Sequence, residues 1–170
     1  MSEKKNLSEL LPQGAFAFRG YNVANLGRTH ELLGHAKYGA IFDEQLRESS
    51  KICSELLGRH VDLVARVNSR VEPTLDEYGE AIALILGVER AQMDCLYQHH
   101  EVEFDKTKLV TGYSLGEIAA LTECGTVSHA DAMSIPLALA EDCVNLAHDV
   151  ELGILFSRQG SLSEEDVSTL

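Results

Sequence analysis

Ser114 stands in the sequence Gly112-Tyr113-Ser114-Leu115-Gly116, which fits the pattern G-x-S-x-G. A serine in this pattern can act as a nucleophile that carries an acyl group as a covalent ester. Glycines at the first and last positions allow a tight turn that leaves the hydroxyl outward, and the backbone N–H after the serine points to where an oxyanion would form. The motif predicts a nucleophilic Ser114 and a backbone oxyanion donor at Leu115.

The segments on both sides of the motif are of the kinds that it needs. Residues 108–111 (KLVT) form a short run typical of a buried strand, and residues 115–124 are rich in helix formers and end at Gly125. We therefore expect Ser114 at a sharp strand-to-helix turn, with the strand central in a parallel sheet flanked by helices. The alternative is a chance occurrence of the pattern in a glycine-rich turn, which these flanking segments disfavour.

The rest of the chain alternates between strand and helix patterns. Residues 15–18 (AFAF) and 153–157 (GILFS) are strand candidates, and a helix is predicted over 43–57. A longer helix follows, in which apolar residues between Leu75 and Leu96 share one face with acidic residues opposite. This alternation is expected of an α/β fold with a parallel sheet.

A further helix is predicted from Ser128 to about His148. Ser128 and Asp131 have the spacing of a capping box at its amino terminus. Pro136 lacks an N–H, and its ring clashes with the carbonyl of Ala132 in a regular helix. The helix is therefore predicted to kink or break at this proline.

Composition excludes several classes of partner. The 170 residues carry 14 Lys+Arg against 27 Asp+Glu, a formal net charge of -13, so the surface repels nucleic acid and anionic lipid. No apolar run approaches the roughly 20 residues that span a bilayer, and the amino terminus has no apolar core of a secretion signal. We expect a cytoplasmic protein with no nucleic-acid or membrane partner.

The histidines and cysteines give no recognisable metal or base motif. No HxH or HExxH spacing occurs, so no metal site is predicted, and His99-His100 are expected to be solvated loop residues in a polar stretch. The four cysteines lack CxxC spacing and are expected to be buried, reduced thiols. They are Cys53, Cys95, Cys124 and Cys143.

Residues 112–121 (GYSLGEIAAL) resemble the GHSLGE(Y/I)AAL signature of malonyl-CoA:acyl carrier protein transacylases and of the acyltransferase domains of polyketide and fatty-acid synthases. Residues 15–20 (AFAFRG) resemble the FxFPGQG strand and loop that open this family. The similarity continues through residues 38–42, Glu72-Pro73 and residues 130–132. The chain is thus similar to the amino-terminal half of the family.

This resemblance implies a hydrolase-like α/β core, truncated before or within a ferredoxin-like subdomain. Residues 15–152 would form the partial acyltransferase core between a polar amino-terminal segment, 1–14, and the start of the small subdomain, 153–170. The implied reaction transfers an acyl group from coenzyme A through Ser114 to the phosphopantetheine thiol of an acyl carrier protein, in fatty-acid or polyketide synthesis. The partners are then acyl-CoA and acyl carrier protein, with no bound cofactor.

Several positions depart from the family pattern. Tyr21 replaces the glutamine near the oxyanion, although its backbone N–H remains a candidate second donor, and Tyr113 and Glu72 replace a histidine and a glutamine. Leu139 stands where malonyl-specific members have an arginine that holds the free carboxylate. Without that guanidinium, a monocarboxylic acyl group is expected in place of malonyl.

The family's catalytic histidine is expected beyond Leu170, so three functions remain open. The chain could be an acyltransferase completed by a missing carboxy-terminal half, on a longer chain or a second polypeptide. It could instead be an inactive acyltransferase-like module for docking or structure. A small serine esterase, which needs an Asp and a His after the serine, is a weaker third reading.

Overall fold

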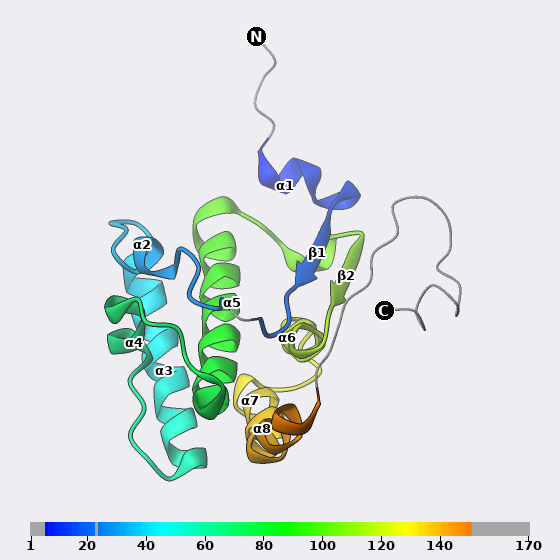
Figure 1. Ribbon diagram of the computed structural model, residues 1–170. Coiled ribbons are helices and arrows are strands. Elements are labelled where there is room, and N and C mark those ends of the chain that lie inside the picture. Colours follow the sequence, from blue (N-terminus) through cyan, green and yellow to red (C-terminus); the bar gives the residue numbers. More distant parts are fainter. Residues whose placement is uncertain (1–5, 23, 151–170) are drawn as a thin grey trace, which may run out of the picture.

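Two strands form the sheet. The computed structural model, which describes residues 6–22 and 24–150, contains β1 (Ala15–Phe18) and β2 (Leu109–Gly112), paired in parallel (Figure 1). Both strand predictions are confirmed. Within these ranges β2 pairs with β1 alone, so the expected central position is not seen. The predicted burial of β2 is wrong, because Leu109 is 56% exposed on a strand with no neighbour on its outer side in this part of the chain.

Helices make up most of the remainder, so the fold is mixed α/β with a small sheet. They are α1 (Leu7–Leu10), the 3-10 turn η1 (Leu11–Gln13), α2 (Thr29–Leu33), α3 (Gly39–Leu57), α4 (Leu63–Ser69), η2 (Leu75–Glu77), α5 (Tyr78–His100), η3 (Phe104–Lys106), α6 (Leu115–Glu123), α7 (His129–Ala138) and α8 (Ala140–Asp149). Figure 1 shows α3 and α5 side by side, with α6 between α5 and the strands. None of the helices in the two described ranges is long and apolar enough to cross a membrane.

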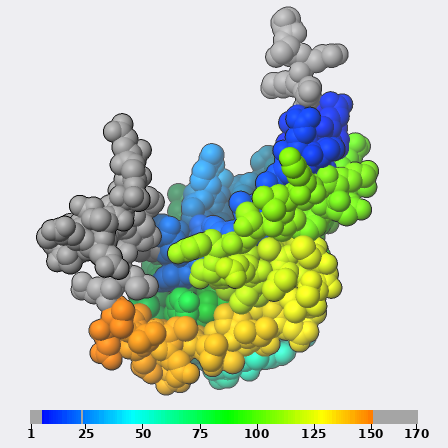
Figure 2. Space-filling view, turned by 90° about the vertical axis from the view of Figure 1, so that its right-hand side faces the viewer, coloured from blue at the N-terminus to red at the C-terminus, as the bar shows by residue number. Residues whose placement is uncertain are grey.

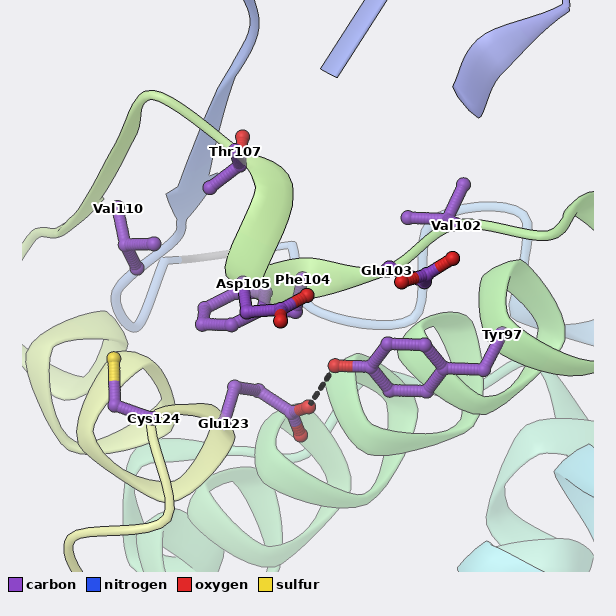
Figure 3. Close-up of a pocket in the computed structure, with 9 residues that line it drawn as sticks. All are labelled: Tyr97, Val102, Glu103, Phe104, Asp105, Thr107, Val110, Glu123 and Cys124. Atoms are coloured by element: carbon purple, nitrogen blue, oxygen red, sulfur yellow. Dashed lines mark hydrogen bonds between the residues drawn. The ribbon is translucent and has the colours of Figure 1, made fainter. Parts of the chain in front are cut away.

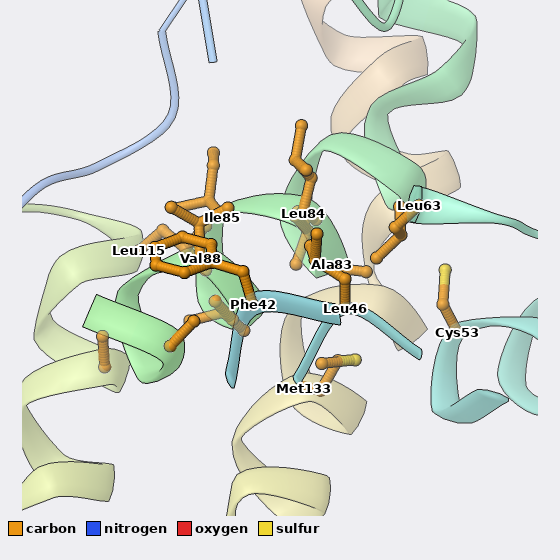
Figure 4. Packing of buried hydrophobic residues seen from close by; sticks show 14 of the residues in the cluster. Phe42, Leu46, Cys53, Leu63, Ala83, Leu84, Ile85, Val88, Leu115 and Met133 are labelled. Atoms are coloured by element: carbon orange, nitrogen blue, oxygen red, sulfur yellow. The ribbon is translucent and has the colours of Figure 1, made fainter. Parts of the chain in front are cut away.

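The hydrophobic core lies mainly between α3 and α5. Phe42, Leu46 and Ile82 are almost fully buried there, and Met133 reaches the same cluster from α7 (Figure 4). Each fully buried side chain of this size stabilises the fold by about 1.5–3 kcal/mol. Gly87 permits the close approach of the two helices, because a Cβ there would lie 2.5 Å from Ser49 Oγ.

Helix α5 confirms the long predicted helix, but its acidic residues are not all placed as predicted. Acidic residues were expected on a face opposite the core, yet Glu80 and Glu89 are buried with the apolar residues between them. Glu80 is neutralised by Arg59 at 2.5 Å and Arg66 at 2.9 Å. The helix is buried on almost every side over its first half, because α3, α6, α7 and α8 all contact it.

The expectation for His99 and His100 as solvated loop residues is wrong. Both lie in the last turn of α5 and are partly buried. His100 Nε2 is hydrogen-bonded to the Tyr38 hydroxyl at 2.9 Å, and the Tyr38 and His99 rings lie 5.7 Å apart. The helix continues four residues past Leu96, the last residue of the apolar pattern, and Tyr38 gives the two histidines a packing partner there.

The helix predicted from Ser128 is interrupted, but not at Pro136, because α7 continues through both Ala132 and the proline. Helix α7 contains Pro136 and ends at Ala138, and α8 begins at Ala140, so the predicted single helix is interrupted at Leu139. Ser128 caps α7 as expected, accepting a hydrogen bond from the Asp131 amide at 3.1 Å. The Ser128 hydroxyl also donates to the Asp131 carboxylate at 2.7 Å.

The cysteine prediction is half right. Cys53 and Cys95 are buried, and burial raises the pKa of the Cys53 thiol to about 11, whereas Cys124 and Cys143 are exposed. Cys124 follows the last residue of α6, and Cys143 lies on the outer side of α8. All four are free thiols.

The predicted domain limits are only partly covered by the described ranges. The expected polar segment 1–14 contains α1 and η1, and Leu11 is buried, so it is a folded part of the chain from Leu7 onward. The strand predicted at 153–157 and the small subdomain predicted at 153–170 lie outside the described residues.

Candidate active site

Ser114 lies at the predicted strand-to-helix turn, between the end of β2 and the first residue of α6. Its backbone has φ 54° and ψ −120°, a conformation that residues other than glycine rarely adopt. Strain of this kind costs about 1–3 kcal/mol and clusters at active sites. The side chain is exposed. The turn therefore holds a serine hydroxyl outward in a strained conformation, as expected of a nucleophile.

The two glycines of the motif are required by close contacts. A Cβ at Gly112 would lie 2.2 Å from the carbonyl oxygen of Gly116, and a Cβ at Gly116 would lie 2.2 Å from that of Phe18. Both distances are far inside van der Waals contact. The first turn of α6 thus packs directly on the backbone of β2 and β1, which places Ser114 at the end of the sheet.

The Leu115 amide, the predicted oxyanion donor, lies at the amino terminus of α6. The Gly116 and Glu117 amides donate at 2.9 Å to the carbonyls of Tyr113 and Ser114. Across the described ranges, no acceptor is bonded to the Leu115 amide, so this N–H is available to a ligand at the start of the helix. Unpaired N–H groups at a helix amino terminus carry partial positive charge and stabilise a developing oxyanion.

The loop after β1 lies against this turn. A Cβ at Gly20 would be 2.7 Å from the Tyr113 carbonyl oxygen and 3.1 Å from Ser114 Cβ, so the loop backbone lies close to Ser114. The Tyr21 ring is directed away to Tyr78 of α5, edge-on, with 4.8 Å between ring centroids. The Tyr21 backbone follows Gly20 directly, so its N–H remains the candidate second oxyanion donor.

A side-chain network that the sequence did not predict holds the same loop. Glu72 accepts hydrogen bonds from the amides of Asn25 at 2.8 Å and Leu26 at 3.0 Å. Asn25 Oδ1 in turn accepts from the Arg19 guanidinium at 2.8 Å and from the Asn22 amide at 3.0 Å. The carboxylate at position 72 therefore organises the turn of the loop, a role that its place in a sequence motif did not indicate.

Glu89 is the second residue that sequence reasoning missed. Its Oε1 accepts the backbone N–H of Arg19 at 2.9 Å, and the residue is 7% exposed. Burial, opposed in part by the bond to Arg19, raises the pKa of Glu89 to about 7. The available signal was an acidic residue directly after the apolar run 81–88.

Glu89 makes the stability of the fold depend on pH. The unfolded chain releases this proton near the ordinary pKa of 4.5 and the folded chain near 7, so stability falls as pH rises between these values. The loss reaches up to about 3 kcal/mol above pH 7. We expect Glu89→Gln to remove this slope in urea unfolding curves measured from about pH 5 to about pH 8. A slope identical to that of the wild-type chain would contradict the buried ionisation.

No general base is bonded to Ser114 in the part of the chain that the structure describes. His129 is turned to Ser49 on α3, with 3.3 Å between Nε2 and Oγ, and burial lowers its pKa. His148 lies 3.9 Å from Asp76, and His100 is bonded to Tyr38. His129, His148 and His100 are thus each directed to a partner other than Ser114.

Leu139 lies at the junction of α7 and α8 and is 53% exposed. Its amide donates to the Pro136 carbonyl at 3.3 Å and its carbonyl accepts from Cys143 at 2.9 Å. No hydrogen bond joins it to the Ser114 turn within residues 24–150. Gly20, the residue before Tyr21, lies against Ser114, whereas among the described residues no hydrogen bond or ion pair links Leu139 to this turn.

A separate pocket lies at the other end of α6. It has a volume of about 620 Å³ and is lined by residues that include Tyr97, Phe104, Glu123 and Cys124 (Figure 3). Glu123 accepts a hydrogen bond from the Tyr97 hydroxyl at 3.3 Å and from Arg90 at 3.1 Å. Because its buried carboxylate is already paired and α6 separates it from Ser114, this pocket is not part of the candidate active site.

The chemistry that remains at the turn is that of a strained serine beside backbone N–H groups. Among the described residues, no group of three or more His, Cys, Asp or Glu side chains is placed to hold a metal ion. No protein-family model, curated protein sequence or solved structure matches the chain.

Proposed function

We propose that this chain is the nucleophile-bearing half of an acyltransferase, in which Ser114 accepts an acyl group from coenzyme A and passes it to the phosphopantetheine thiol of an acyl carrier protein. The observation that carries the proposal is the backbone of Ser114, at φ 54° between β2 and α6, with the Leu115 amide beside it. The proposal includes a hydrolase-like α/β core, of which β1, β2 and α6 are the part next to the nucleophile.

The proposed reaction has two steps. Ser114 Oγ attacks the thioester carbonyl, the C–S bond breaks, and the serine proton ends on the departing coenzyme A thiol. During the attack, the carbonyl oxygen becomes negative beside the amides of Leu115 and Tyr21. The phosphopantetheine thiol then attacks the serine ester, forming a new thioester, and its proton returns to Ser114.

A carboxy-terminal half would supply the base for both steps. The elements β2, α6, α7 and α8 lie on the face shown in Figure 2. Large apolar side chains are exposed on these elements and the turn that joins them, and such exposure is typical of surfaces that another part of a protein covers. They are Leu109, Tyr113, Leu121, Ile135, Leu139 and Leu146.

The acyl group is expected to be a monocarboxylic one. A malonyl carboxylate buried without a counter-charge costs several kcal/mol, and Leu139 supplies none at the position where the family has arginine. Acetyl and butyryl groups should therefore load onto the protein faster than malonyl, and Leu139→Arg should shift the preference toward malonyl. The measurement is the intact mass of the protein after incubation with each acyl-CoA.

Two results would contradict this proposal. Faster loading of malonyl than of acetyl would overturn the expected selectivity. The same mass after incubation with every acyl-CoA, and with an activated ester such as p-nitrophenyl acetate, would overturn acyl transfer itself. Loading of the 170-residue chain alone is expected to be slow, because oxyanion donors and binding without the base leave an acceleration of about 10³–10⁴ over water.

The second candidate function is an inactive module that serves in docking or structure. It is favoured by one observation, that no base is bonded to Ser114 within the two described ranges. The two proposals differ in what the serine does. An inactive module would not be acylated even by an activated ester, whereas the acyltransferase half would accumulate a serine ester that it cannot discharge quickly.

A further inference from the structure

One hydrogen bond ties the loop at the nucleophile to the core helix α5. The Arg19 amide donates to Glu89 Oε1 at 2.9 Å, and the next residue, Gly20, is the one that lies close to Ser114. Tyr21, whose N–H is the candidate second oxyanion donor, follows directly. A shift of the loop at Arg19 would therefore move the second donor relative to the serine.

We propose that Glu89 is a positioning residue: by accepting the Arg19 amide, it fixes the backbone of residues 19–21 against Ser114 so that the Tyr21 N–H completes an oxyanion hole. This inference rests on the acyl transfer proposed above. It assigns to a side chain on α5 a role that acts through the loop and not through contact with the substrate.

Glu89 is buried, so its bond to the Arg19 amide is not a solvent-exposed surface contact. The residue is 7% exposed, and no hydrogen-bond partner of its Oε2 is found in the described part of the chain. It lines a pocket of about 240 Å³ whose other walls include Leu26, Leu32 and Ile85. Arg19, Asn25 and Arg28 also line this pocket, so the carboxyl group lies among both apolar and polar side chains. Burying it with one oxygen unbonded is still costly unless the bond to the Arg19 amide is useful.

The charge of Glu89 should govern how firmly the loop is held. A carboxylate accepts an amide N–H more strongly than a neutral carboxyl group does. The ionisable groups around it are Arg19 on the loop, Glu123 on α6 and Arg28, which lines the same pocket. Because Glu89 changes charge at about pH 7, the loop should be held more firmly above that pH than below it.

The test compares three variants with the wild-type chain. Glu89→Ala removes the acceptor, Glu89→Gln keeps an oxygen acceptor but no charge, and Asp94→Asn is a matched change elsewhere on α5. Acetylation by p-nitrophenyl acetate is followed by intact mass, with the rate of Ser114→Ala subtracted, from about pH 6 to about pH 8.

Glu89→Ala should lower the Ser114-dependent rate about tenfold, with no change in substrate affinity. This is less than the factor of about 10²–10³ expected for complete loss of an oxyanion donor, because the donor is displaced and not removed. The rate of Glu89→Gln should stay within about threefold of the wild-type rate at the lower pH. The ratio of the wild-type rate to the Glu89→Gln rate should then rise several-fold as the pH is raised across the range. Asp94→Asn should behave as wild type. A purely structural role for Glu89 would not change this ratio with pH.

Hydrogen exchange of the Arg19 amide gives a second readout that does not depend on activity. Protection should be lost in Glu89→Ala and kept in Glu89→Gln. Unchanged protection and an unchanged rate in Glu89→Ala would overturn the positioning role while leaving acyl transfer intact. A wild-type chain with no Ser114-dependent acetylation would overturn the proposed function, and the Glu89 inference would fall with it.

Discussion

Gly116→Ala is expected to dismantle the nucleophile turn. A Cβ at this position would lie 2.2 Å from the Phe18 carbonyl oxygen, 2.5 Å from the Phe18 carbonyl carbon and 2.7 Å from the Arg19 carbonyl oxygen. All three atoms belong to the backbone, so no side chain can rotate to make room. Helix α6 would have to move away from β1, which would break the 3.2 Å bond from the Tyr113 amide to Phe18.

The expected cost of Gly116→Ala exceeds that of ordinary overpacking, which is about 1–3 kcal/mol. Thermal unfolding followed by circular dichroism should show a large decrease in Tm or no cooperative transition, and labelling of Ser114 should be lost. Gly34→Ala is the matched control, because φ there is −81° and an added Cβ would lie 3.4 Å from the His30 carbonyl oxygen. Equal Tm values for Gly116→Ala and wild type would show that β1 and α6 are not packed as described.

Ser114→Gly is expected to abolish acylation and to stabilise the fold. Glycine populates positive φ without the strain that a serine has at φ 54°, so relieving the turn should add about 1–3 kcal/mol, less the entropy that glycine gains in the unfolded chain. Ser114→Ala removes the hydroxyl but keeps a Cβ, so it should lose acylation with little change in stability. The difference in Tm between these two variants isolates the strain at the nucleophile.

Ser114→Gly and Ser114→Ala with the same stability would contradict a strained turn at this position. Both variants must be tested in a background that lacks exposed thiols, because Cys124 and Cys143 are free and exposed and can take an acyl group from a thioester. Replacing these two cysteines with serine provides that background without touching the core.

The strand-turn-helix unit could be predicted because its signals are local. The apolar run at residues 15–18, the apolar run before Gly112 and the helix formers after Ser114 each determine their own segment, and the structure confirms all three. The turn itself followed from the two glycines, and the structure explains why glycine is needed: a Cβ at either position would lie 2.2 Å from a backbone oxygen.

The residues that hold the site could not be predicted, since their roles depend on contacts between distant parts of the chain. Glu89 is 70 positions from Arg19, and Glu72 is 47 positions from Asn25. Periodicity assigned the acidic residues of α5 to an outer face, but four helices cover this helix and bury Glu89. The position of His100 was missed for the same reason, because its partner Tyr38 lies 62 residues earlier.

The most direct measurement of the central claim is a map of where the acetyl group resides after incubation with acetyl-CoA. Treatment with neutral hydroxylamine removes acetyl groups from thiols and leaves serine esters and lysine amides, so peptide mass spectrometry after this step identifies the acetylated serines by the residue that is modified. We predict a single peptide acetylated on serine, modified at Ser114 and absent from Ser114→Ala. Acetylation spread over other exposed serines, or an unmodified Ser114 beside acetylated cysteines, would contradict a nucleophilic role for this residue.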